Sequence, residues 1–241
     1  MEESIVQTGA RIIIRFDNGV YITETTCWAV IVAVALIIAA LVGTRRLERN
    51  PRGAQAIAEL IVETVYKFVD DNMGKNLRSF APYVGTLFLY LLACNAVGLI
   101  GARAPTADMN FTFAMSIMVF FIIQYNSIKS RGIGGYLKHF AEPFPFMIPI
   151  KIIEEITFPI SLSFRIFGNI LAGVIIVELY MHMMGSVSEK LHMVFPFLQI
   201  GTPLPVNLFF DMFEPFLQAF VFSMLTMSFI AKAIAVHGAE E

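Results

Sequence analysis

The chain has 241 residues, of which 57% are hydrophobic and only 15% are charged, and its formal net charge is −2. A soluble domain carries roughly 25% charged residues, so this composition and a mean hydropathy of +0.71 indicate an integral membrane protein. The small net charge and the lack of a basic stripe with interleaved aromatics exclude a nucleic-acid partner. Cys27 and Cys94 lie in apolar segments without metal-ligand spacing, which favours packed or lipid-facing thiols over a redox pair.

The hydrophobic runs predict the membrane spans. A bilayer core of about 30 Å requires roughly 20 apolar residues in a helix. The N-terminus opens with acidic residues and has no cleavable signal pattern, so we expect the first span to be retained. We predict an all-α membrane protein of one domain, residues 1–241, with spans at about 25–43, 80–101, 111–128, 143–185 and 194–236. The last two exceed one perpendicular crossing, so each is expected to tilt strongly, bend back or form a long hairpin arm.

The main polar insertion, residues 44–79, separates the first two spans. Within it, apolar residues recur at helical spacing beside acidic ones near 53–72, which predicts an amphipathic helix at the membrane interface.

Basic residues concentrate in the 44–79 segment and in the 129–142 loop, whereas the 102–110 and 186–193 loops carry one each, Arg103 and Lys190. The positive-inside rule therefore predicts a cytoplasmic C-terminus and, with five crossings, an external N-terminus. Arg11 and Arg15 oppose this assignment.

The later spans contain an unusual number of ionisable residues. Each charge at mid-membrane depth costs at least about 2.5–3.5 kcal/mol on insertion scales, so such residues indicate an ion path or a paired network. They are Lys151, Glu154, Glu155, Arg165, Glu178, His182, Asp211, Glu214 and Lys232, accompanied by the amides Asn169, Asn207 and Gln218.

Arg165 lies in the run ISLSFRIFGNILAG, too far from either end for its side chain to reach an interface. One interpretation is a salt bridge between helices, to Glu178 or Asp211. The other is a fixed cation that meets a mobile carboxylate on a partner. A guanidinium stays protonated at physiological pH. At 4 Å and an effective dielectric near 20 it attracts a carboxylate by about 4 kcal/mol, enough to strip off a proton or sodium ion.

Three polar residues follow Arg165 in the same region. Asn169 lies one turn further on nearly the same face, where it would steer water or the guanidinium or form an ordinary interhelical hydrogen bond. Glu178 is thirteen residues from Arg165, about 20 Å along a helix and roughly 140° around it, so the two are poor partners. Glu178 and His182, one turn apart, indicate either a separate carboxylate of an ion path or a solvated interfacial pair.

The last span carries a second polar group. Asp211, Glu214 and Gln218 fall on one stripe of an aromatic helix, and Pro215 predicts a kink there. If the two long segments run antiparallel, this stripe can face Arg165 and Glu178. Two carboxylates favour a wet half-channel over a packing seam.

The segments PISLSFRIFGNILAG (159–173) and PFLQAFVFSMLT (215–226) together resemble the a subunit of F-type ATP synthases, and PTADMNFTFAM (105–115) resembles a third segment of that family. The resemblance extends from the second span to the C-terminus. The residues that match the family pattern are Pro159, Ser161, Leu162, Arg165, Phe167, Gly168 and Asn169 in the first segment and Leu217, Gln218, Ala219, Phe220 and Phe222 in the second.

The resemblance implies that Arg165 faces the carboxylates of a c-subunit ring, between two offset aqueous half-channels beside two tilted helices. It also implies a b-subunit peripheral stalk, the other ATP synthase subunits, a bacterial cell membrane and transported H+ or Na+. Relatives often carry an acid or His nine residues after the arginine, where this chain has Val174, so we expect the carboxylate role to have shifted one turn to Glu178. Lys151 replaces another frequent acid, which leaves Glu154 or Glu155 for the cytoplasmic half-channel.

The predicted path runs past Glu178, His182, Asp211 and Glu214 to a ring carboxylate, and leaves near Glu154 and Glu155 after the ring has turned. The alternative is a self-contained secondary transporter or channel in which Arg165 binds an anion; we find no inverted repeat that would favour it. No nucleotide loop, metal cluster or nucleophile–base pair is present in the sequence, so we predict neither an enzyme active site nor a cofactor.

Overall fold

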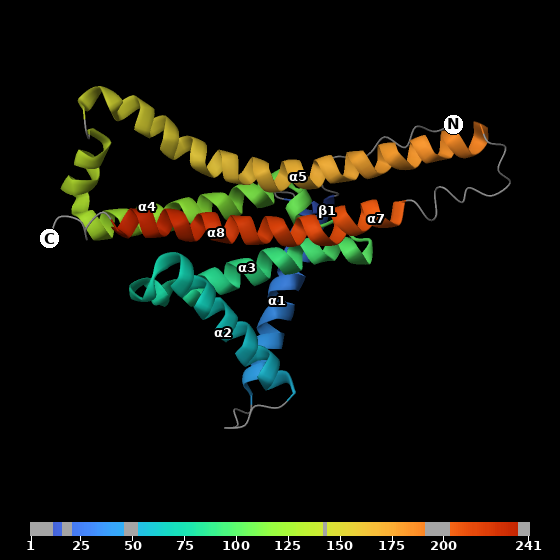
Figure 1. The fold of residues 1–241 in the computed structure, drawn as a ribbon, viewed down its shortest axis with the longest axis horizontal. Helices are drawn as coiled ribbons and strands as arrows, with labels where there is room; N and C mark the ends of the chain where they lie inside the picture. Colours follow the sequence, from blue (N-terminus) through green and yellow to red (C-terminus); the bar gives the residue numbers. More distant parts are fainter. Residues whose placement is uncertain (1–11, 16–20, 46–52, 142–143, 191–202, 236–241) are drawn as a thin grey trace.

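The computed structural model describes residues 12–15, 21–45, 53–141, 144–190 and 203–235 (Figure 1). The α-helices are α1 (Glu24–Thr44), α2 (Ala54–Met73), α3 (Ala81–Ala96), α4 (Met109–Ala141), α5 (Ile148–Lys190), α7 (Pro203–Leu208) and α8 (Glu214–Ala235). The short elements are the strands β1 (Ile12–Arg15) and β2 (Tyr21–Thr23), the 3₁₀ turns η1 (Lys75–Phe80), η2 (Val97–Ile100), η3 (Pro105–Ala107) and η4 (Pro145–Met147), and the π-helical turn η5 (Phe209–Phe213).

In the described part of the chain, five helical segments are long and apolar enough to cross a bilayer, which confirms the predicted all-α membrane fold. They are Glu24–Thr44, Lys75–Ile100, Met109–Lys138, Pro145–Lys190 and Glu214–Ile234.

Helix α1 is apolar around most of its circumference, as expected of a helix that faces lipid. Thr23 caps its N-terminus, and its side chain accepts a hydrogen bond from the backbone N–H of Thr26. Two side chains fix its position against the rest of the fold. Thr25 donates to Asp108 at 2.9 Å, and the Tyr90 hydroxyl donates to the Ala29 carbonyl at 3.2 Å.

Helix α2 corresponds closely to the amphipathic helix predicted near 53–72. It packs against α3 at Gly85, where an added Cβ would lie 2.9 Å from a methyl group of Val65. After α2 the chain turns through Gly74, whose φ of 82° is favourable only for glycine. Arg78 in η1 then forms an ion pair with Asp70 of α2 at 3.8 Å.

The prediction of a loop at 129–142 is wrong for the residues described, because α4 continues to Ala141. The chain kinks at Gly132, where φ is 68°, and then resumes a helix. Arg131 and Lys138 lower the hydropathy of this stretch without lowering its helix propensity, so the end of the apolar run does not mark the end of the helix.

The predicted fourth span, 143–185, is one continuous helix, α5, of 43 residues that passes through Pro159 without a break. Figure 1 shows α5 extending along the pair formed by α4 and α8. Between these helices lies an apolar core to which Leu162 and Ile166 of α5 and Phe222 of α8 contribute. The rings of Phe158 and Phe229 lie 4.2 Å apart at one end of this contact.

The fifth predicted span, 194–236, is helical from Pro203 to Ala235; residues 194–202 lie outside the described part. The expected distortion at Pro215 takes the form of the π-helical turn η5 directly before it. Proline has no N–H and its ring clashes with the carbonyl four residues earlier, and a π-turn widens the helix at that point.

A two-stranded antiparallel hairpin, β1 and β2, precedes α1 and was not expected from the all-α interpretation. Both strands consist mainly of β-branched and aromatic residues, IIIR and YIT, which favour extended backbone.

Candidate functional site: two cavities along α5 and α8

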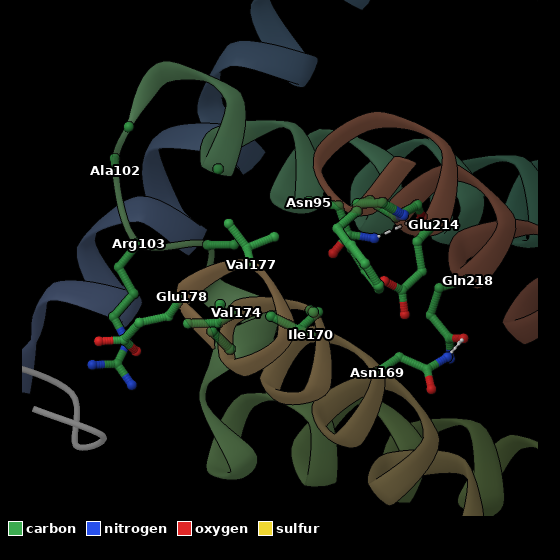
Figure 2. A pocket seen from close by; sticks show the side chains of 17 residues that line it. Asn95, Ala102, Arg103, Asn169, Ile170, Val174, Val177, Glu178, Glu214 and Gln218 are labelled. Carbon is green, nitrogen blue, oxygen red and sulfur yellow. Dashed lines mark hydrogen bonds between the residues drawn. The ribbon is translucent and has the colours of Figure 1, made fainter. Parts of the chain in front are cut away.

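The first cavity, of about 480 Å³, lies between α5, the η5–α8 segment and the α3–η3 connection (Figure 2). Its polar lining residues come from separate parts of the sequence: Asn95, Arg103, Asn169, Glu178, Glu214 and Gln218. The cavity therefore brings together four residues of the predicted ion path.

At one end of the first cavity, Asn169 of α5 donates a hydrogen bond to Gln218 of α8 at 2.9 Å (Figure 2). One turn along α5, Gly173 is buried and allows close approach of α8. A Cβ at this position would lie 2.9 Å from the Phe210 ring and 3.4 Å from an oxygen of Glu214. The absence of a side chain at Gly173 thus makes room for the Glu214 carboxylate between the two helices.

At the other end, Glu178 lines the cavity together with Arg103, which the sequence interpretation had counted only as a loop charge. Figure 2 shows Arg103 and Glu178 at the edge of the cavity, which both residues line. Arg103 is half-buried and Glu178 is exposed. A basic residue shortly before the PTAD turn was the signal available in the sequence.

A buried hydrogen-bond network holds the α3 side of the first cavity. The Asn95 amide donates to the carbonyl of Pro215 at 2.9 Å and accepts from the Thr106 hydroxyl at 2.6 Å. Thr106 is 0% exposed and Asn95 is 5% exposed, so water cannot replace these partners. This network ties α3, η3 and the start of α8 together, and the sequence interpretation did not identify it. An asparagine inside the apolar run LLACNAVG was its only sequence signal.

The second cavity, of about 590 Å³, contains Arg165 and Glu154 of α5. The two are eleven residues apart, which places them on nearly the same face and about 16 Å apart along the helix. Apolar residues of both long helices complete the lining, including Leu162 of α5 and Leu225 and Phe229 of α8. Arg165 is exposed and forms no ion pair with the side chains that the structure describes.

Glu155, next to Glu154, faces a different helix. It accepts a hydrogen bond from Gln124 of α4, and the Tyr136 hydroxyl donates to Gln124 at 2.8 Å. Of the two adjacent acids, only Glu154 lines the cavity that contains Arg165.

An apolar layer separates the two cavities. On α5, Ile166 lies between the Arg165 and Asn169 positions and is 1% exposed. On α8, Ala219 and Phe222 lie between Gln218 and Leu225 and are 1% and 0% exposed. Neither cavity is therefore continuous with the other through the α5–α8 contact.

The α8 stripe was expected to be able to face Arg165 and Glu178, and two of its three residues line a cavity with Glu178 but not with Arg165. Glu214 and Gln218 share the first cavity with Glu178, whereas Arg165 lines the second. His182 is exposed and is not among the residues that line either cavity. Asp211 has its backbone in η5, and its side chain lies outside what the structure describes.

The fold and these cavities define a multi-pass α-helical membrane protein with ionisable groups gathered along two long helices. The family model described as "ATP synthase A chain" matches residues 26–231. Proteins named ATP synthase subunit a are similar in sequence over most of the chain. That of Moorella thermoacetica is 33% identical over 90% of this chain and 93% of its own length. That of Desulforamulus reducens is 36% identical over 80% and 71%, and ATP synthase subunit a 2 of a Bradyrhizobium species is 34% identical over 87% and 86%.

The chain belongs to the family of ATP synthase subunit a. It is accordingly a non-catalytic subunit of the membrane sector and works in a complex with other ATP synthase subunits.

Proposed function

We propose that this subunit is the ion-translocating stator of a rotary F-type ATP synthase, in which H+ or Na+ flow turns a c-subunit ring. One observation carries the proposal: two cavities that contain ionisable residues lie along the same pair of helices, with buried apolar residues between them. An ion cannot cross that layer directly, because a charge without polar partners at this depth is costly. It has to be carried past the layer by a moving partner.

The first cavity is the half-channel that loads the ring from the outer side. In the proposed order, the ion passes Glu178, with His182 and Asp211 on the approach, and then Glu214. Support comes from the shared lining of Glu178 and Glu214 and from the Asn169–Gln218 hydrogen bond at the inner end. Carboxylates and amides offer the oxygen ligands that either a hydrated proton or a sodium ion can use.

The second cavity is the half-channel that empties toward the cytoplasm, with Glu154 as its carboxylate. Glu154 is exposed and shares this cavity with Arg165, whereas Glu155 is engaged by Gln124 on α4. We therefore assign the ion-release role to Glu154 and a structural role to Glu155.

Arg165 separates the two paths electrostatically. Its guanidinium cannot give up a proton, and it is exposed at the edge of the α5–α8 pair, where a ring carboxylate can approach it. The bare carboxylate leaves the release cavity, passes Arg165 and is neutralised again from the loading cavity. A membrane potential supplies about 2.3 kcal/mol per charge per 100 mV to drive this cycle.

The dimensions and charges support a particular placement in the membrane. Helix α5 is about 65 Å long at 1.5 Å per residue, twice the hydrocarbon thickness, so we propose that it and α8 lie strongly tilted along the ring as a hairpin. The basic residues of η1 and of the later part of α4 indicate the cytoplasmic side, with the N-terminus outside and the C-terminus inside. The b-subunit stalk is the expected second neighbour, and the cell membrane of a bacterium is the expected location.

The test is Arg165→Ala in the complete ATP synthase, reconstituted in vesicles under an imposed ion gradient and potential. We expect ATP synthesis to fall to background. Arg78→Ala, which removes a cation paired with Asp70 away from both cavities, is the matched control and should retain synthesis. Gradient-driven synthesis that survives in Arg165→Ala would contradict the proposal, as would uptake of an anionic substrate by the purified subunit alone.

A further inference from the structure

We propose that a third cavity, at the membrane interface, binds a phospholipid headgroup that carries a phosphate and a primary ammonium, as phosphatidylethanolamine does. This cavity has a volume of about 790 Å³ and lies between the end of α1, one face of α2 and the turn η1. The inference goes beyond the proposed function, because the described lining of this cavity shares no residue with the two cavities along α5 and α8.

The third cavity lies at the depth of the lipid headgroups. Gly43 and Thr44, which line it, are the last two residues of the first membrane span, and Lys75 is the first residue of the second. Helix α2 connects these spans and is amphipathic, as expected of a helix in the interface. It packs closely on α1, since a Cβ on Gly43 would lie 3.3 Å from the Cβ of Ala58. The cavity is therefore formed where two span ends meet an interfacial helix.

Charged side chains of alternating sign line the third cavity at four-residue intervals. They are Glu63, Lys67, Asp71 and Lys75. Side chains four residues apart on a helix can form ion pairs. In the described part of the chain, however, no ion pair within 4 Å joins any two of these four, whereas Arg78 pairs with Asp70 at 3.8 Å. The two acids and the two bases are therefore available to the charges of a ligand.

A ligand with both signs of charge matches this lining better than an anion does. Its phosphate would lie between Lys67 and Lys75, and its ammonium would lie between Glu63 and Asp71. These two places are one helical turn apart, about 5.4 Å, a separation that the two-carbon bridge of ethanolamine can span. A headgroup with a phosphate as its only charge, such as phosphatidylglycerol, would leave both acids close to a negative charge.

The aromatic content of the lining distinguishes a primary ammonium from a quaternary one. A quaternary ammonium has no N–H to donate and is bound on the faces of aromatic rings. Tyr66 is the one aromatic residue in the described lining, and the Arg78 guanidinium already lies 4.6 Å from the centroid of its ring. A primary ammonium can instead donate hydrogen bonds to the carboxylates of Glu63 and Asp71. The lining thus favours ethanolamine over choline.

The acyl chains of a phospholipid would meet an apolar surface beside the third cavity. Leu41 and Val42 directly precede Gly43 on α1 and are exposed, and Val62 of α2 is an exposed residue of the lining itself. Free phosphoethanolamine would leave this surface uncovered. The ligand that we infer is therefore the membrane lipid.

The experiment uses the complete ATP synthase in phosphatidylcholine vesicles that contain a minor amount of a phospholipid with a photoreactive acyl chain. The headgroup of this lipid is ethanolamine, choline or glycerol in three parallel samples. After irradiation, lipid adducts are mapped on the peptides that cover residues 41–78. The variants are Glu63→Gln/Asp71→Asn and Lys67→Gln/Lys75→Gln. The matched control, Glu24→Gln/Glu189→Gln, removes two acids that the described lining of this cavity does not include.

In the unchanged protein we expect the ethanolamine lipid to give about fivefold more adducts than the other two, the ratio that one charge pair in water can supply. Glu63→Gln/Asp71→Asn should abolish this preference, because amides do not balance the ammonium charge. Lys67→Gln/Lys75→Gln should reduce labelling by all three lipids, because each carries a phosphate, and should keep the preference for ethanolamine. The control variant should behave as the unchanged protein does.

Equal labelling by the three headgroups would overturn the inference, and so would a preference for ethanolamine that survives in Glu63→Gln/Asp71→Asn. If none of the lipids labels residues 41–78 in the complete complex, another subunit covers the cavity and the inference is wrong. Since lipid labelling is measured and not ion-driven synthesis, each of these results leaves the proposed function standing.

Discussion

The two cavities along α5 and α8 are similar in size but differ in how they are built. The first lies between α5, the η5–α8 segment and the α3–η3 connection, and buried hydrogen bonds join Asn95, Thr106 and Pro215 beside it. The second is lined only by α5 and α8 and is mostly apolar, with Glu154 and Arg165 as its charged residues. Polar groups in the first cavity meet one another, whereas Arg165 in the second meets no acid among the described residues.

This difference indicates that the two cavities have different roles. A cavity with its own acids and amides can hold an ion inside the subunit. In the second cavity Arg165 and Glu154 lie about 16 Å apart along α5, so in the proposed function a ring carboxylate is the acid that approaches Arg165. The comparison therefore predicts that substitutions in the first cavity act through its shape and bonding, and those in the second through charge.

After the complete loss expected for Arg165→Ala, filling the first cavity should have the largest effect. In Gly173→Leu the new side chain points at the Phe210 ring and the Glu214 carboxylate, which lie only 2.9 and 3.4 Å from the position that a Cβ would occupy. The helices would have to separate or the carboxylate to move, and an ion without polar partners faces a barrier of about 3 kcal/mol. We expect ion-driven ATP synthesis to fall roughly a hundredfold, measured in vesicles after confirming assembly of the complex.

Gly134→Ala is the control for this substitution, because a Cβ at that position meets nothing and Gly134 lies outside both cavities. Normal synthesis in Gly173→Leu would show that the space beside Glu214 is not part of the path.

The second cavity can be tested with two adjacent acids, Glu154 and Glu155, of which only Glu154 lines it. Glu154→Gln removes the carboxylate that shares the cavity with Arg165, and we expect at least about a tenfold loss of synthesis, because a charged cleft raises the local concentration of its counter-ion. Glu155→Gln keeps a polar side chain beside Gln124 and should change synthesis much less. Synthesis rates at equal levels of assembled complex decide the comparison.

Equal losses in Glu154→Gln and Glu155→Gln would mean that the direction of the side chain does not matter for release. A larger loss in Glu155→Gln would move the release path to the α4 side.

This pair of acids also shows what could not be predicted from the sequence alone. Glu154 and Glu155 differ by about 100° in helical phase, and the sequence identifies both as acids in an apolar helix. Which one faces the cavity depends on where α4 packs, and α4 continues beyond its apolar run through the kink at Gly132, which redirects it. Such tertiary contacts leave no local pattern.

Other features of the fold and of the site could be predicted from the sequence to different degrees. The spans and α2 follow from hydropathy and periodicity, and most of their ends were predicted to within a few residues. The hairpin before α1 had a signal that went unused, since Asn18-Gly19 lies between two β-branched runs, a pairing typical of tight hairpins. Arg103 had a weak signal, because it reaches the first cavity only through the connection between η2 and η3.

The smallest expected effects compare the hydrogen bonds beside the two cavities. Thr106→Val and Tyr136→Phe each remove one hydroxyl that donates to a side-chain amide oxygen, of Asn95 and Gln124 respectively. Thr106 is fully buried, so the Asn95 oxygen would lose its partner without gaining water, at a cost of about 1–3 kcal/mol. Tyr136 is only half-buried, and water can reach the gap, so we expect a loss of about 0.5–1.5 kcal/mol.

The measurement is the thermal unfolding temperature of each purified variant in the same detergent and at the same heating rate. Thr106→Val should lower it more than Tyr136→Phe, and Thr106→Val should also slow ion-driven synthesis, because Asn95 holds the start of α8 through the Pro215 carbonyl. Since Tyr136 acts on Glu155 and not on Glu154, its loss should leave synthesis nearly unchanged. The reverse order of stability would show that the buried network of the first cavity is replaceable, and that its enclosure depends on apolar packing alone.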